Sequence, residues 1–215
     1  MITIRNLKVS FTKEYDALHD VNLTVNDGEK IAIVGDSDSG KTTLLRSIAG
    51  LQSFAEGEIF IGTQPIQKVN FKQDVSLGYI PKVPVFKNKK TVIENLRYVL
   101  KIRGYDQASM SFKVITALKM FGIDSLKNIP VESLTYHQKM LVQLARVSMR
   151  KVDIVLIDNI AKNAIGEDKQ KVIEGIKTLM ELNPDATFIM TTDSEKIAKE
   201  LQLKIVKIKL GTIVE

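Results

Sequence analysis

The feature that most limits what this chain can fold into is a glycine-rich segment, Gly35-Asp-Ser-Asp-Ser-Gly-Lys-Thr42. It matches the pattern G-x-x-x-x-G-K-[ST], and it stands between a buried-strand pattern at residues 30–34 and a helix expected at residues 42–49. In that setting the glycines let the backbone curl until its N–H groups point at phosphates, and the new helix adds its positive end. The segment therefore predicts a phosphate-binding loop for a nucleotide.

Each residue of this loop has an expected contact with the nucleotide. Lys41 is expected to reach the β- and γ-phosphates, and the Thr42 hydroxyl is expected to bind Mg²⁺. The other expected contacts are Gly35, Asp36, Ser37, Asp38, Ser39, Gly40 and Thr43. The alternative is a glycine-rich turn without a ligand, but the strand before the loop and the helix after it favour the phosphate site.

Strand and helix patterns alternate along most of the chain, which predicts an α/β fold. Buried-type strands joined by helices favour a mostly parallel sheet covered on both faces. Three consecutive segments with helical spacing indicate a helical insertion at about residues 83–150. Strands are expected at 2–11, 21–25, 30–34, 57–62, 75–80, 154–157 and 186–190, helices at 91–103, 108–121, 135–149 and about 167–182, and a hairpin at 205–214.

Composition excludes several classes of protein. With 215 residues, 44% of them hydrophobic, the chain is long enough for one globular unit with a substantial core. No run free of Asp, Glu, Lys and Arg exceeds nine residues, far below the roughly 20 that cross a bilayer. The chain has no cysteine, and its N-terminus lacks the apolar core of a signal peptide, so we expect a cytoplasmic protein.

The net charge of +6 is modest. It would suit an anionic membrane face or nucleic acid, but a solvated basic surface is the more common reason for such an excess. Because aromatic and basic residues do not alternate in the way that suits base stacking, we expect no nucleic-acid partner.

Around this loop, the order of further motifs resembles that in the ATPase subunits of ATP-binding-cassette (ABC) transporters. The segment from Ala17 to Gly35 resembles the family's entry into its phosphate loop, and Gly78-Tyr-Ile-Pro-Lys82 resembles its Q-loop region. Leu134-Thr-Tyr-His-Gln138 takes the place of the signature LSGGQ, and Ile154-Val-Leu-Ile-Asp158 resembles Walker B. The resemblance covers nearly the whole chain, and it implies a single ABC-type P-loop domain over residues 1–215 with an antiparallel β subdomain.

This resemblance implies ligands, partners and a location. ATP and Mg²⁺ are the implied cofactors, with Asp158 holding Mg²⁺ through water and Phe11 stacking on adenine; alternatively, Phe11 is an apolar residue at a strand end. The implied partners are an integral membrane permease on a separate chain and a second nucleotide-binding domain, in a homodimer or heterodimer. The implied location is the cytoplasm, peripheral at the inner face of the cell membrane.

Residues that carry hydrolysis in the family are replaced here. Asn159 stands where the family has the glutamate that activates water, Thr192 occupies the position of the switch histidine, and Lys82 replaces the Q-loop glutamine. An amide cannot accept a proton, and general-base catalysis is typically worth ~10²–10⁴ in rate. The sequence therefore predicts slow or absent hydrolysis.

The signature segment also departs from the family pattern. Tyr136 and His137 replace two glycines that let backbone N–H groups approach a partner's γ-phosphate, whereas Thr135 and Gln138 keep polar groups there. A purely structural interpretation also accounts for the segment, because Thr135-x-x-Gln138 is a capping box for the helix expected at 136–149. The structural interpretation is the one we favour.

Two acidic residues in the phosphate loop weaken the expected nucleotide site. Asp38 stands where the family usually has glycine, and Asp36 is also acidic. At about 8 Å and an effective dielectric of about 20, each carboxylate would repel one unit of phosphate charge by roughly 2 kcal/mol before screening. Alternatively, both side chains point into solvent, where ions reduce the repulsion.

Three functions are compatible with this pattern. The first is the ATP-binding subunit of an ABC transporter or related membrane complex, with nucleotide binding retained and hydrolysis slow or absent. The second is an interaction or regulatory protein that keeps the cassette fold and has lost nucleotide function. The third is ordinary transport ATPase activity, with a partner supplying the missing groups. Because cassettes pair head to tail, each ATP site combines the Walker motifs of one subunit with the signature of the other. The third function therefore requires a partner that compensates for the replaced residues near Walker B and for those in the signature.

Overall fold

The α/β pattern of the sequence forms two units in the computed structural model, which describes residues 1–12, 15–71, 73–161 and 165–214. The first unit contains Met1–Tyr79, Val152–Asn159 and Pro184–Glu215. The second contains Ile80–Lys151, which includes the range 83–150 expected for the helical insertion, together with Ile160–Asn183. The phosphate-loop motif and the Walker B segment therefore belong to the first unit, and the signature segment belongs to the second.

An antiparallel sheet in the first unit begins the chain. Its strand order is β2-β1-β4-β5, and alternate apolar side chains of β1, such as Ile2 and Ile4, are buried. Gly57 adopts a φ of 92°, and a Cβ there would lie 2.5 Å from the Asn6 carbonyl oxygen, so only glycine fits. The strands are β1 (Ile2–Thr12), β2 (Tyr15–Val25), β4 (Glu56–Ile61) and β5 (Gln64–Pro65).

A second sheet, of six strands in the order β10-β9-β3-β8-β7-β6, carries the phosphate loop. Strand β3 pairs in parallel with β8 and β9, and β7 pairs in parallel with β8, whereas β10 is antiparallel to β9. Every residue of β7 and β8 is buried, as expected for parallel strands covered on both faces. The strands are β3 (Lys30–Val34), β6 (Leu77–Ile80), β7 (Ile154–Asp158), β8 (Thr187–Thr192), β9 (Lys204–Lys209) and β10 (Thr212–Ile213).

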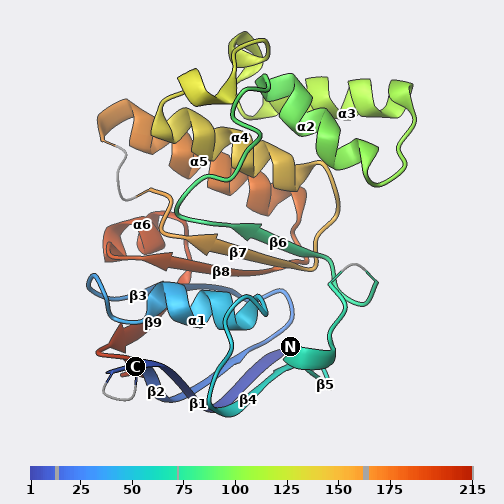
Figure 1. Ribbon diagram of the computed structural model, residues 1–215. Helices are drawn as coiled ribbons and strands as arrows, with labels where there is room; N and C mark the ends of the chain where they lie inside the picture. Colours follow the sequence, from blue (N-terminus) through green and yellow to red (C-terminus); the bar gives the residue numbers. More distant parts are fainter. Residues whose placement is uncertain (13–14, 72, 162–164, 215) are drawn as a thin grey trace. The chain divides into compact units, whose positions relative to one another are not determined.

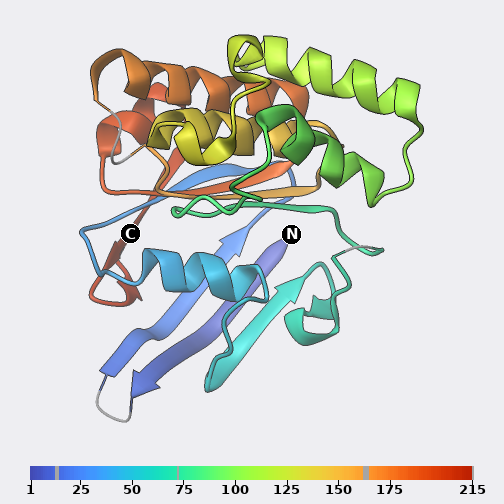
Figure 2. The ribbon, with the colours of Figure 1, turned by 45° about the horizontal axis from the view of Figure 1, so that its top comes forward.

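Helix α1 (Lys41–Ile48) lies between the two sheets of the first unit (Figures 1 and 2). Its residues Leu44, Leu45 and Ile48 are fully buried in one apolar cluster with residues of both sheets. Burial of each such side chain stabilises the fold by roughly 1.5–3 kcal/mol, so α1 is held firmly directly behind the phosphate loop. The unit also contains the short helices η1 (Ile66–Lys68) and α6 (Glu195–Glu200).

The second unit is helical, and its helix α4 packs on α5, α3 and α2. The contact of α4 with α5 is close at Gly175, where a Cβ would lie 3.0 Å from the side chains of Leu141 and Leu144. The elements are α2 (Val92–Lys101), α3 (Gln107–Met120), η2 (Asp124–Leu126), η3 (Val131–Ser133), α4 (Tyr136–Ser148) and α5 (Gly166–Leu182). Within the described ranges, no helix is both long and apolar enough to cross a membrane.

The fold class predicted from the sequence is confirmed, and among the predicted strands β2 differs most in its bounds. Strand β2 begins at Tyr15 and not at residue 21. Its pairing with β1 shifts register between Leu7↔Val21 and Val9↔Leu18, and Asp20 has a φ of 51°. Because these irregularities interrupt the period of two, the alternation that identifies a strand is lost over residues 15–20.

Glu94 closes a capping box at the start of α2 and carries a pH-dependent part of the stability. Its Oε2 accepts a hydrogen bond from the Thr91 N–H at 2.8 Å, and this bond, followed by the interaction with Lys90, lowers its pKa from 4.5 to about 2. A carboxyl group whose pKa is lowered by folding stabilises the folded state above its unfolded pKa, and this stabilisation is lost as the pH falls.

We therefore expect Glu94→Gln to lower the free energy of unfolding at pH 7, because the variant keeps the capping box but loses the charge. The difference between the two proteins should shrink as the pH falls from about 4.5 toward 2, and urea unfolding at a series of pH values measures it. A difference that stays constant from pH 7 to pH 3 would show that the charge is not the cause.

Candidate functional site

The phosphate-loop motif connects β3 to α1, and both of its glycines are required by space. A Cβ at Gly35 would lie 2.3 Å from the Ile208 carbonyl oxygen, and a Cβ at Gly40 would lie 2.6 Å from that of Ala17. Gly40 also has a φ of 95°, which disfavours any other residue. Between them the Ser39 N–H donates to the Asp36 carbonyl at 3.3 Å, so the loop makes a tight turn before the helix.

The side chain of Lys41 folds back into this loop. Its ammonium group donates to the carbonyl oxygen of Gly35 at 2.7 Å, to the hydroxyl of Ser39 at 3.1 Å, and to the carbonyl oxygen of Asp36. Lys41 is only 7% exposed. These partners place a positive charge at the centre of the curl, beside the N-terminus of α1, where the helix dipole also favours an anion.

Asp158, at the end of β7, is joined to the loop by a hydroxyl group. Its Oδ1 accepts a hydrogen bond from the Thr42 hydroxyl at 3.0 Å and another from the Thr191 hydroxyl at 2.9 Å. Asp158 is 2% exposed, whereas Thr42 is exposed. Hydroxyl and carboxylate oxygens are ligands that Mg²⁺ prefers, so the Thr42–Asp158 pair fits this cation.

The fit to magnesium depends on additional ligands. Among the residues that the structure describes, no group of three or more His, Asp or Glu side chains is placed to hold a metal ion. Mg²⁺ normally keeps several waters and binds one or two protein groups together with substrate phosphates. The donor set therefore fits Mg²⁺ that arrives with a nucleotide, and not an all-protein metal cage.

Thr191 was not assigned a role from the sequence, yet its hydroxyl contacts Asp158 inside the sheet. We expect Thr191→Val to destabilise the first unit by about 1.5–3 kcal/mol, because a buried carboxylate loses a hydrogen bond. Urea unfolding measures the change, and Thr191→Ser, which keeps the hydroxyl, is the matched control. Equal midpoints for the valine and serine variants would contradict the role given to this hydroxyl.

Asn159 occupies a strained and enclosed position directly after Asp158. Its φ is 46°, in the left-handed region where asparagine is enriched. Its N–H donates to the Thr191 carbonyl at 3.1 Å, and its Oδ1 is buried without a hydrogen-bond partner. An unsatisfied buried amide oxygen typically costs about 1–3 kcal/mol, so the packing does not explain why this residue is polar.

Thr192, which the resemblance predicts at the position of the switch histidine, closes the turn that follows β8. Its hydroxyl accepts a hydrogen bond from the Ser194 N–H at 3.1 Å, and its carbonyl accepts one from the Gly35 N–H at 3.3 Å. The side chain is fully buried. The position therefore links β8 to the start of the phosphate loop and offers no group that titrates near neutral pH.

The acidic residues of the loop face solvent. Asp36, Ser37 and Asp38 are all exposed, which agrees with the alternative in which water and ions screen the carboxylates. Asp38 has a φ of 61°, a conformation in which glycine is most favoured and aspartate is tolerated. Glycine would therefore suit this position for two reasons, because it adopts a positive φ without strain and because it carries no negative charge.

Three other side chains of the first unit bear on the expected site. Phe11 is 56% exposed near the end of β1. This exposure is compatible with both interpretations of Phe11, stacking on adenine and an apolar residue at a strand end. Thr43 is half-buried in the first turn of α1. Tyr79 was not identified from the sequence; burial and then the charge of Asp158 raise its pKa to about 12, so its hydroxyl stays protonated.

The Q-loop segment is attached to helix α4 within the second unit. Lys82 is exposed, and its carbonyl oxygen accepts a hydrogen bond from the Tyr136 hydroxyl at 3.0 Å. Further along the helix, Gln143 donates to the Pro81 carbonyl at 3.3 Å and Arg146 donates to the Val85 carbonyl at 2.8 Å. Tyr136, which the sequence predicts at the place of a signature glycine, therefore helps to hold residues 81–85 against α4.

The signature segment forms the start of α4. The capping box expected at Thr135 is present, with Gln138 donating its N–H to the Thr135 hydroxyl at 3.4 Å and accepting from the Thr135 N–H at 3.0 Å. His137 Nε2 lies 2.9 Å from an Asp168 oxygen in the first turn of α5. The two residues that replace glycines thus make contacts within the second unit.

The predicted site residues divide between the two units. The first unit brings Lys41, Thr42, Asp158 and Asn159 together around the ends of β3, β7 and β8. Lys82 and the signature residues Thr135–Gln138 belong to the second unit. In the first unit, the curled loop, the Lys41 ammonium group and the Thr42–Asp158 pair are suited to a phosphate chain with a magnesium ion. Residues 159–166 contain no histidine, aspartate or glutamate that could accept a proton from water.

Comparison with known proteins agrees with this geometry. The family model described as "ABC transporter" matches residues 18–162. The methionine import ATP-binding protein MetN of Clostridioides difficile is 29% identical over 219 residues, covering 100% of this chain and 68% of that protein. The sn-glycerol-3-phosphate import ATP-binding protein UgpC of Burkholderia cenocepacia is 32% identical over 168 residues, covering 75% of this chain and 45% of that protein.

Solved structures show the same fold. The dimeric structure of a bacterial ABC transporter cassette has a TM-score of 0.87 at 23% identity, covering 100% of this chain and 97% of that chain. A dimeric ATP-binding cassette in a post-hydrolysis state, bound to ADP and Pi, has a TM-score of 0.85 at 24% identity with the same coverage. Alignments of this chain span from 38% to 68% of the first curated relatives' own length.

Proposed function

This chain belongs to the ABC transporter family, and from that membership we propose that it is the ATP-binding subunit of a membrane transport complex. The observation that carries the proposal is the Thr42–Asp158 contact of 3.0 Å beside a phosphate loop whose glycines are required by space. Lys41 and the N–H groups at the start of α1 would bind the phosphates of ATP, and Thr42 and Asp158 would hold Mg²⁺. When bound, Mg²⁺ would neutralise negative charge on the phosphates.

We also propose the partners and the location that this role requires. The relatives are named as import ATP-binding proteins, which supports a permease on a separate chain. The dimeric cassettes among the solved structures support a second nucleotide-binding domain as a partner. A subunit of this kind would lie in the cytoplasm at the inner face of the cell membrane.

The proposed subunit binds ATP but hydrolyses it slowly. Asn159, whose amide cannot accept a proton, stands next to Asp158, and Thr192 is buried where the family has a histidine. Loss of a general base typically costs ~10²–10⁴ in rate. The binding of ATP, and not its hydrolysis, would then have the structural or regulatory role in the complex.

An ATPase assay of the purified chain tests the proposed rate. Typical enzymes turn over about ten times per second, so we expect a rate that is lower by roughly 10²–10⁴-fold. The Lys41→Ala variant identifies contaminating activity, because it removes the ammonium group from the loop. A fast rate that Lys41→Ala abolishes would contradict slow hydrolysis.

A second candidate function is a cassette-fold interaction protein without nucleotide. The observation that favours it is the pair of exposed carboxylates, Asp36 and Asp38, on the loop that must accept an anionic ligand. If this function is correct, calorimetric titration with millimolar ATP, with and without Mg²⁺, gives no heat of binding. Saturable binding would exclude it.

A further inference from the structure

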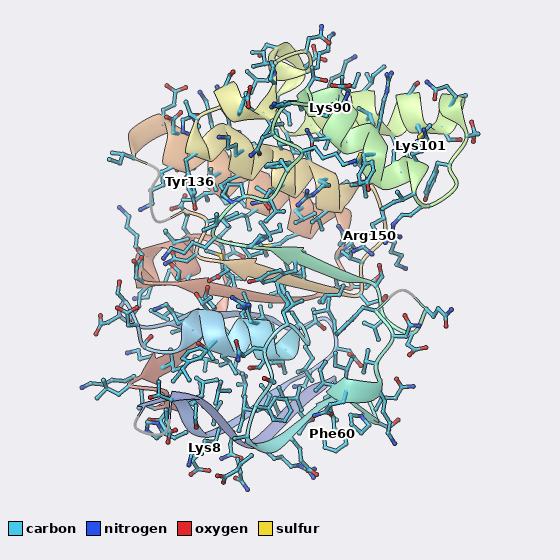
Figure 3. All side chains as sticks on the ribbon, in the orientation of Figure 1. Lys8, Phe60, Lys90, Lys101, Tyr136 and Arg150 are labelled. Carbon is cyan, nitrogen blue, oxygen red and sulfur yellow. The ribbon has the colours of Figure 1, made fainter. Side chains whose placement is uncertain are left out.

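A basic hollow lies between α2 and α3 in the second unit, away from every motif of the nucleotide site. Its volume is about 310 Å³, and it is lined by Lys87, Lys90, Arg97, Lys101, Tyr98 and Met110, among others. Figure 3 shows Lys90 and Lys101 at the two ends of α2, with the remaining turns of the helix between them. Pockets for small ligands begin at about 300 Å³, so this hollow suits a small molecule or one headgroup.

The hollow carries an excess of positive charge. Its four cations face one carboxylate, that of Glu94, which leaves three positive charges in excess. Glu94 is already engaged, since one oxygen accepts from Lys90 at 2.9 Å and the other accepts from the Thr91 N–H at 2.8 Å. Its lowered pKa keeps it ionised, but it has little capacity to neutralise a further cation.

Arg97 is a cation of the hollow that has no ion-pair partner among the described residues. Its Nε is buried and has no hydrogen-bond partner, although buried polar atoms of native proteins are normally paired. Among the residues that the structure describes, no carboxylate lies within 4.0 Å of its guanidinium group. An arginine placed in this way is suited to an anionic ligand, because its planar group binds phosphate oxygens in pairs.

An aromatic ring completes the wall of the hollow. The ammonium group of Lys87 lies 3.5 Å from the centre of the Tyr98 ring, and Met110 of α3 contributes an apolar surface. A ring or short chain on the ligand would contact Tyr98 and Met110 while its charged group meets Arg97. The walls therefore fit a ligand with one strongly anionic end and one apolar part.

We propose that this hollow binds a phosphomonoester, with the phosphate on Arg97 and Lys101 and the apolar part on Tyr98 and Met110. A phosphate carries nearly two negative charges and three acceptor oxygens, which match the excess of cations better than one carboxylate does. The site is separate from the ATP site, and the inference goes beyond the proposed function. The ligand is either a soluble phosphomonoester or the phosphomonoester headgroup of a lipid such as phosphatidic acid.

Phenyl phosphate is the probe that tests this site on the full chain. Titration followed by amide NMR shifts should give saturable changes at residues 87–110, and phenyl phosphate should bind several-fold more tightly than inorganic phosphate because its ring adds apolar contact. Both probes can also enter the ATP site, and shifts at residues 35–43 report that event separately. Shifts confined to residues 35–43 would overturn the proposal.

Two charge variants and a control sharpen the test. We expect Arg97→Gln to weaken binding at residues 87–110 at least tenfold, and Glu94→Gln to strengthen it several-fold. Arg103→Gln removes the same charge from an exposed residue outside the hollow and should change binding less than twofold. Because the Arg97 guanidinium has no ion-pair partner among the described residues, Arg97→Gln should not lower the melting temperature. Equal binding by the Arg97 and Arg103 variants would overturn the proposal.

A vesicle arm distinguishes the two sources of the ligand. Co-sedimentation with phosphatidic acid vesicles, but not with phosphatidylcholine vesicles, that is lost in Arg97→Gln and kept in Arg103→Gln would identify a lipid headgroup. Binding of phenyl phosphate that depends on Arg97, without vesicle binding, would identify a soluble ligand. The absence of both would overturn the proposal.

Discussion

Replacing Asn159 with glutamate is expected to raise the ATPase rate of the chain by about 10²-fold, the lower end of what a general base contributes. The carboxylate would stand one residue after Asp158, which accepts a hydrogen bond from the Thr42 hydroxyl beside the phosphate loop. Asn159→Gln is the matched control, since it has the same length as glutamate but cannot accept a proton. Equal rates for the two variants would show that the missing base is not what limits turnover.

The same variant should have a cost in stability and a shifted pH profile. The φ of 46° at this position favours asparagine, and other side chains pay roughly 1–2 kcal/mol for it. Burial and the neighbouring Asp158 both raise the pKa of an introduced carboxyl group. We therefore expect the rate of Asn159→Glu to rise with pH above neutrality, and urea unfolding should show both the glutamate and the glutamine variant to be less stable than the parent protein.

Replacing Asp38 with glycine is expected to strengthen ATP binding by about tenfold. The change removes a carboxylate that repels each unit of phosphate charge by roughly 2 kcal/mol before screening, and the exposure of Asp38 reduces that figure. It also supplies the residue best suited to a φ of 61°, so the loop should become more stable as well. Calorimetric titration with ATP and Mg²⁺ measures the gain.

Asparagine at the same position separates charge from backbone conformation. Asp38→Asn keeps a side chain that tolerates the left-handed region but removes the charge. If repulsion dominates, the asparagine variant gains most of the affinity that the glycine variant gains. Unchanged affinity in both variants would show that the carboxylate does not affect the bound phosphates.

The parts of the site that the sequence predicted are those fixed by short-range geometry. The pattern G-x-x-x-x-G-K-[ST] lies within residues 35–42, and the capping box at Thr135 follows from residues three apart. The parallel sheet followed from runs of buried residues in β7 and β8. In each of these cases the pattern is local, so one segment contains the whole signal.

The contacts that the sequence did not predict join segments far apart in the chain. The hydroxyl of Thr191 meets Asp158 across two neighbouring strands, 33 positions away. Tyr136 meets the carbonyl of Lys82 over 54 positions. The N–H of Asn159, directly after β7, donates to the carbonyl of Thr191 in β8, 32 positions away. Only the fold brings these groups together.

One titration tests the central claim, that the phosphate loop binds ATP with Mg²⁺, most directly. Calorimetry of the purified chain with ATP, in the presence and absence of Mg²⁺, should show saturable binding that Mg²⁺ strengthens, because Thr42 and Asp158 are placed to hold the ion. Lys41→Ala should lose this binding while keeping its helical circular dichroism. No heat at millimolar ATP, or binding that Lys41→Ala leaves unchanged, would contradict the claim.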